Sequence, residues 1–63
     1  MSELERWYRI AESISSLISS VEAEIGAKNF TDLSDRHALS KIDKKLYEAL
    51  EVAQKAISAL EDE

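Results

Sequence analysis

The sequence predicts an all-α fold, an antiparallel helical hairpin of two long helices that dimerises into a four-helix bundle. Each half of the chain carries an apolar ladder with alternating steps of three and four residues, the only glycine lies between the ladders, and proline is absent. Such steps keep side chains on one stripe of an α-helix, whereas a strand alternates its faces every two residues. We therefore expect residues 1–63 to form a single helical-hairpin domain.

The first helix is expected over about residues 3–25. Ser2 is a good N-cap, and Glu5 follows it by three residues, which is the spacing of a capping box. Gly26 is expected in the left-handed conformation just past the helix, at the start of a turn over residues 26–31. The ladder of this helix consists of Leu4, Trp7, Ala11, Ile14, Ile18, Val21 and Ile25.

The second helix is expected over about residues 32–61. Thr31, Asp32 and Ser34 are all preferred N-cap types, so the start is placed between residues 32 and 35. The second ladder is rich in alanine, and we expect Trp7 to lie opposite two of these small residues, at positions 53 and 56. The ladder consists of Leu39, Ile42, Leu46, Ala49, Ala53, Ala56 and Leu60.

The hairpin is expected to need a partner. A chain this short rarely forms a sufficient core without disulfides, a metal or oligomerisation, and it has no cysteine and one histidine. Its apolar stripes are also wider than a two-helix pair can bury. The partner is expected to be a further copy of the chain, with a dimer as the favoured homo-oligomer, or a helical partner protein. The expected interface residues are Ile10, Leu17, Leu50, Ala53, Ile57 and Leu60.

No residue pattern indicates catalysis, a cofactor or a metal. His37 is the only histidine, and no Glu-x-x-His pair of the kind that binds iron in helical bundles is present. The sequence is therefore interpreted as a non-enzymatic protein-interaction module that self-associates or pairs with a partner helix through its apolar ladders.

The charge distribution leaves two alternatives open. The net charge is −5, which disfavours nucleic acid, but residues 28–45 carry five basic and three acidic groups. One alternative is a small regulator that binds structured RNA, and the other is an acidic inhibitor protein. Tyr8 and Arg9 are a further candidate anchor for a partner. The basic patch on the second helix consists of Arg36, Lys41, Lys44 and Lys45.

The longest apolar run is two residues, so the sequence predicts no contact with the membrane interior. The first ten residues start acidic and contain no apolar core of a signal peptide, so a cytoplasmic location is expected. A serine-rich stretch over residues 13–20 has two interpretations: a solvated outer face, or a surface of small residues that lets another helix approach closely.

Short motifs resemble those of the small helical-hairpin "E" co-chaperones of type III secretion needle subunits. They are Met1-Ser2-x-Leu4-Glu5, the turn stretch Gly26-Ala27-Lys28-Asn29-Phe30, the following Ala38-Leu39 and the acidic C-terminus. This resemblance implies a partner that helps to keep an aggregation-prone needle subunit soluble. The chain is also similar, in size and architecture only, to the Rop-type plasmid copy-number regulators.

Overall fold

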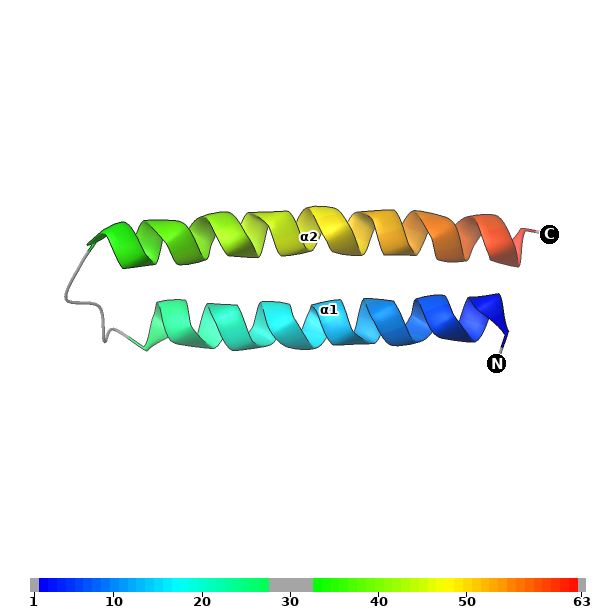
Figure 1. Cartoon of the computed structure of the whole chain (residues 1–63), viewed down its shortest axis with the longest axis horizontal. Coiled ribbons are helices and arrows are strands. Elements are labelled where there is room, and N and C mark those ends of the chain that lie inside the picture. Colours follow the sequence, from blue (N-terminus) through cyan, green and yellow to red (C-terminus); the bar gives the residue numbers. More distant parts are fainter. Residues whose placement is uncertain (1, 28–32, 63) are drawn as a thin grey trace.

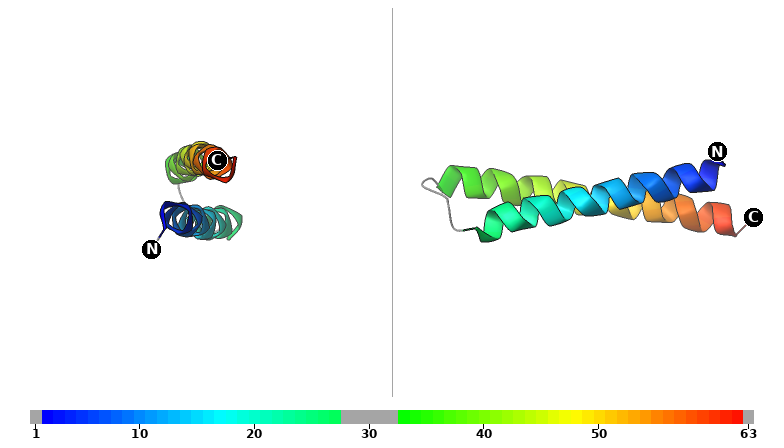
Figure 2. Two further views of the ribbon diagram at one scale, coloured as in Figure 1. Left: turned by 90° about the vertical axis from the view of Figure 1, so that its right-hand side faces the viewer. Right: turned by 90° about the horizontal axis from the view of Figure 1, so that it is seen from below.

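The computed structural model describes residues 2–27 and 33–62 and forms a hairpin of two helices. α1 covers Glu3–Gly26 and α2 covers Leu33–Glu61, where about 3–25 and 32–61 were expected. The helices run antiparallel side by side (Figure 1) and cross at a shallow angle (Figure 2). The molecule is a rod 49 Å long, and its described residues contain no strand. The predicted all-α helical hairpin is confirmed.

The start of α1 has the predicted cap. The Ser2 side-chain oxygen accepts a hydrogen bond from the backbone N–H of Glu5 at 3.2 Å. This bond satisfies one of the four N–H groups that a helix leaves without a partner at its first turn. Glu3 and Glu5 lie in the same turn, where the helix dipole favours negative charge.

The end of α1 differs from the prediction. Gly26 is the last helical residue, and its backbone is not left-handed. The helix closes instead through Ala27, which is right-handed and donates its N–H to the Glu24 carbonyl at 3.3 Å. A 3₁₀-type hydrogen bond of this kind, between residues three apart, tightens the last turn, so the helix needs no left-handed glycine cap. The connection over residues 28–32, including Lys28 and Phe30, lies outside the described residues.

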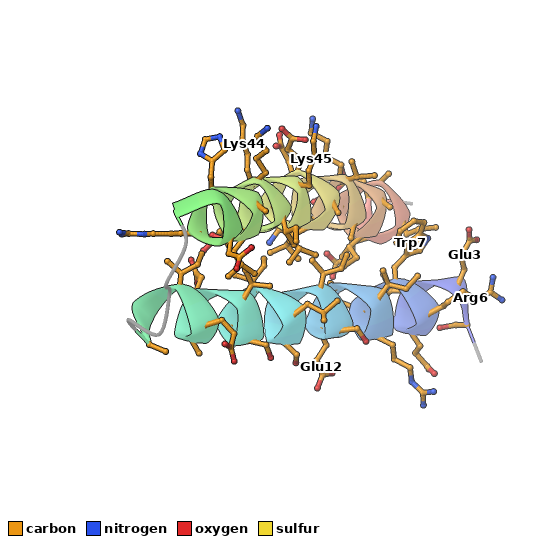
Figure 3. All side chains as sticks on the ribbon, turned by 60° about the vertical axis from the view of Figure 1, so that its left-hand side comes forward. Glu3, Arg6, Trp7, Glu12, Lys44 and Lys45 are labelled. Atoms are coloured by element: carbon orange, nitrogen blue, oxygen red, sulfur yellow. The ribbon has the colours of Figure 1, made fainter. Side chains whose placement is uncertain are left out.

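The inner face of α1 is the predicted ladder. Ile18 is buried at its centre, and the other six ladder residues are each partly buried. Trp7 points into the space between the two helices (Figure 3). We call the contact between the inner faces of α1 and α2 the seam.

The inner face of α2 differs from the predicted ladder at every second position. Ile42 was expected in the seam but is 48% exposed, and Ala49 is also exposed. Ala56 is only partly buried, beside the seam. The residues of α2 that the structure places in the seam are Leu39, Asp43, Leu46, Leu50, Ala53, Ile57 and Leu60.

Packing energies explain this choice of face. Turning Leu50 and Ile57 inward in place of two alanines removes six additional carbons from water, worth about 5 kcal/mol at full burial. Exposing Ile42 gives back about 1.5–3 kcal/mol. The gain exceeds the loss, and α2 therefore tolerates a carboxylate, Asp43, in its seam.

Two hydrogen bonds between side chains fix the register of the hairpin. The Tyr8 hydroxyl donates to Glu61 at 2.7 Å, and the Tyr47 hydroxyl donates to Glu22 at 3.1 Å. The step from residue 8 to 22 on α1 equals the step from residue 61 back to 47 on α2, two heptads in each case. Because a tyrosine side chain leans toward the start of its own helix, the backbones are offset by about one turn from these bonded pairs. The two inner faces then match step for step, with Leu4 opposite Leu60 and Trp7 opposite Ile57, which adjoins Ala56.

Candidate interaction surface

The seam divides the hairpin surface into two flanks. Each residue of a helix is rotated by about 100° from the one before it. The residue that follows Trp7 or Val21 therefore lies on one side of the seam, and the residue that precedes Ala11 or Ile18 lies on the other. The same holds on α2, so each flank combines one edge of each helix.

The polar flank is bridged within the chain. Both tyrosine–glutamate hydrogen bonds lie on it, each with a tyrosine from one helix and a carboxylate from the other. The bond to Glu61 raises the pKa of Tyr8, with desolvation and the carboxylate charge adding to the shift. The bond to Glu22 likewise raises the pKa of Tyr47. The polar flank consists of Tyr8, Ser15, Glu22, Tyr47, Gln54 and Glu61.

Asp43 is the one charged residue in the described part of the seam. One of its carboxylate oxygens, Oδ1, is buried and has no hydrogen-bond partner among the described residues. Burial raises the pKa of Asp43 above its ordinary value, and the negative charge of the neighbouring Glu22 raises it further. Asp43 is therefore a weak point in the packing of the hairpin near its turn.

The apolar flank, on the other side of the seam, is not bridged. Leu17 is 53% exposed and Val52 is 62% exposed. Four of the six large apolar side chains that the structure exposes lie on this flank, and the other two are the hydrogen-bonded tyrosines. The apolar flank consists of Ile10 and Leu17 from α1 and Ile42, Ala49, Val52, Ala56 and Ala59 from α2.

The expected interface residues divide between the seam and this flank. Ile10 and Leu17 are exposed on the apolar flank. Ala53, which is 1% exposed, and Ile57 are buried in the seam, where Leu50 and Leu60 are partly buried. The four α2 residues already contact α1, so the free surface of α2 is built from residues that the sequence interpretation did not select.

In the candidate anchor, Tyr8 and Arg9, only the tyrosine side chain has a hydrogen-bond partner among the described residues. The Tyr8 hydroxyl is bonded to Glu61 within the chain, and Arg9 is exposed.

Three of the four basic residues of α2 share one outward face of the helix, and Arg36 lies apart from them. The three are Lys41, Lys44 and Lys45, which follow the i, i+3, i+4 spacing of a single face. All four are exposed, and Arg36 lies nine residues before Lys45, two and a half helical turns, so the two point to opposite sides. Lys44 and Lys45 extend away from α1 (Figure 3). Lys45 forms an ion pair with Glu48 at 3.5 Å. Such an exposed pair is ordinary helix-surface chemistry.

Within the described ranges, 2–27 and 33–62, no three histidine, cysteine, aspartate or glutamate side chains are grouped so that they could hold a metal ion. Neither helix is long and apolar enough to cross a membrane.

No protein family, curated protein or solved structure matches this chain.

Sequence reasoning missed the tyrosine–glutamate bridges and the role of Asp43. A signal for the bridges was present, because on each helix a tyrosine is followed by a glutamate 14 residues later. That spacing places the tyrosine and the glutamate on one edge of each helix. When the helices run antiparallel, the tyrosine of each helix lies beside the glutamate of the other. Asp43 carried no such signal, because a carboxylate argues against a seam position until the packing of its neighbours is known.

Proposed function

We propose that this chain is a non-enzymatic interaction module that associates through its apolar flank, with a homodimeric four-helix bundle as the favoured assembly. The observation that carries the proposal is the contrast between the flanks. One flank is bridged by hydrogen bonds within the chain, and the other exposes Ile10, Leu17, Ile42 and Val52 together. Grouped apolar side chains of this kind mark sites of protein contact.

The amount of exposed surface supports a partner of similar size. A compact protein of 7.1 kDa is expected to expose about 4,100 Å², whereas the hairpin exposes 4937 Å². The excess is roughly 800 Å², which is the area that each partner buries in a protein interface of standard size. A second hairpin therefore supplies the cover that this molecule lacks.

Sedimentation equilibrium tests the proposal directly. We expect the wild-type chain to be a dimer at micromolar concentration. Leu17→Glu places a charge on the apolar flank and should shift the chain toward the monomer. Ser16→Glu adds the same charge one residue away on an exposed position and should leave the dimer intact. A folded wild-type monomer of about 7 kDa would refute the proposal.

A chaperone-like role uses the same surface. We propose that an amphipathic helix of another protein can take the place of the second hairpin, since helices dock on apolar grooves through residues spaced by three and four. The setting that we favour is the cytoplasm, because a cysteine-free chain suits a reducing compartment. Binding of a candidate helical peptide should be lost in Leu17→Glu and kept in Ser16→Glu.

Ionic strength separates this proposal from binding of RNA. Contacts with phosphates weaken steeply as salt rises, whereas association through apolar side chains hardly changes. The separation of Arg36 from Lys45 around α2 does not favour the RNA alternative.

A further inference from the structure

We propose that the partner on the apolar flank is a second copy of this chain, bound so that both turns lie at the same end of the bundle and α1 of each copy packs against α2 of the other. This inference rests on the function proposed above and adds the geometry of the assembly. It follows from the register of the hairpin together with the sizes and charges of the side chains on the flank.

The register determines which residues meet in such a dimer. A two-fold axis parallel to the helices rotates one hairpin onto the other without sliding it, so each residue stays at its own level. The tyrosine–glutamate bonds relate Ile10 to Ala59 and Leu17 to Val52. Since side chains lean toward the start of their own helix, the facing backbones are offset by about one turn. The side chain of Ile10 thus reaches residues 56–59 of α2, and that of Leu17 reaches residues 49–52.

Side-chain sizes at these levels are complementary. Ile10 of one copy faces Ala56 and Ala59 of the other, and Leu17 faces Ala49 and Val52. A large side chain entering a space lined by small ones fills it without overpacking, and it meets no polar group there. The two-fold axis repeats each contact, so four large side chains of α1 become covered.

Charges at the turn end are complementary as well. By the same register the side chain of Glu24 reaches residues 42–45 of α2, where Lys45 is the charged residue on this side of the seam. Glu24 and Lys45 lie on the same side of the seam as the apolar flank, Glu24 in the row of Ile10 and Leu17. Each copy therefore places a carboxylate beside an ammonium group of the other.

The alternative arrangement, with turns at opposite ends, is poorer. There α1 packs against α1, and the two large residues of each copy meet only if Ile10 is level with Leu17 of the other copy. That alignment brings Glu3 level with Glu24, because each lies seven residues further along its helix. Like charges then oppose each other at both ends of the α1 pair.

Distance measurements between spin labels distinguish the two arrangements. The chain has no cysteine, so His37→Cys provides a single attachment point, at an exposed position near the turn. With both turns at one end, the labels in the dimer should lie within about 30 Å of each other, a few helix diameters. With turns at opposite ends, most of the length of the 49 Å rod separates them. A main distance beyond about 40 Å would overturn the inference.

Disulfide trapping gives an independent readout. A mixture of two single-cysteine chains, Leu17→Cys and Ala49→Cys, is oxidised, with one chain carrying a tag that changes its mass. The same-end dimer should yield mainly the mixed disulfide. Predominant Leu17→Cys or Ala49→Cys homodisulfides would contradict it. Sedimentation of the same samples separates this failure from failure of the proposed function, because a chain that stays monomeric refutes both.

Discussion

The two flanks of the hairpin lie on either side of the same seam, but they differ in how their side chains are satisfied. On the polar flank, tyrosine hydroxyls and glutamate carboxylates find partners across the seam, at 2.7 and 3.1 Å. On the apolar flank, Leu17 and Ile42 lie about half exposed and cannot satisfy each other in this way. The difference shows that polar side chains can close one edge of a helix pair within the chain while the apolar side chains of the other edge stay exposed.

The contrast also explains why the two helices have unequal roles. α1 presents a row of large and charged residues on the apolar flank, with Ile10 and Leu17 between two glutamates. α2 presents mainly alanine there, with Ile42 and Val52 as the larger members. In the dimer that we propose, α1 supplies the large side chains and α2 of the other copy supplies the space that receives them.

The largest expected effect tests the apolar flank. If folding is coupled to association, stability depends on protomer concentration by mass action. A hundredfold dilution then removes about 2.7 kcal/mol per mole of dimer, and the melting temperature falls. Melting curves followed by circular dichroism over that range check this. Curves that superimpose would show that the hairpin folds as a monomer, without contact between its apolar flank and a partner.

The next effect tests the seam that separates the flanks. Ala53→Leu adds three carbons at a position that is 1% exposed, and overpacking should cost about 1–3 kcal/mol. Ser16→Leu adds bulk at an exposed position of α1 and should change stability by less than about 0.5 kcal/mol. Thermal denaturation of both variants at one concentration decides the matter. A more damaging Ser16→Leu would mean that the serine-rich face of α1 is a contact surface.

A smaller effect concerns Asp43, which lies between the flanks near the turn. Its pKa is raised in the folded state, so the folded chain binds the proton more tightly than the unfolded chain does. The stability that this residue contributes is complete below the ordinary aspartate pKa, and it is lost as pH rises through the folded value. Asp43→Asn should therefore raise the melting temperature at pH 7, and its advantage should shrink toward about pH 4. A constant advantage would contradict this.

The smallest effect tests the polar flank. Hydrogen bonds to glutamate raise the pKa values of Tyr8 and Tyr47, the only two tyrosines. A raised pKa means that this contribution to stability is present below the ordinary tyrosine value and is lost as pH rises through the folded value. Titration followed by ultraviolet absorbance should show both phenols ionising later in the folded chain than in urea. Tyr8→Phe and Tyr47→Phe should each leave one late phenol and lower the melting temperature slightly.

The sequence predicts α1 better than α2 for a physical reason. On α1 the ladder through Ile14 and Ile18 is the one stripe rich in large apolar residues, so a single face can turn inward. On α2 two neighbouring ladders share every second residue, and they differ in whether Ile42 or Asp43 occupies the seam. Only the packing of both helices together determines that choice.

The candidate surface was likewise predictable from the sequence on α1 but not on α2. Ile10 and Leu17 stand outside the α1 ladder in the sequence, and the structure leaves them exposed. Their counterparts on α2 followed from the face that α2 turns inward, so the exposed positions of Ala49 and Val52 could not be read from periodicity alone.

The bond between Tyr8 and Glu61 has a consequence for engineering. It joins residues 53 positions apart, so the second turn of α1 and the last turn of α2 are held together at one end of the rod (Figure 1). A hairpin whose two ends emerge side by side can be inserted into a surface loop of a host protein without pulling that loop apart. It would then stand out from the host as an arm 49 Å long, which displays its turn at a fixed distance from the host surface.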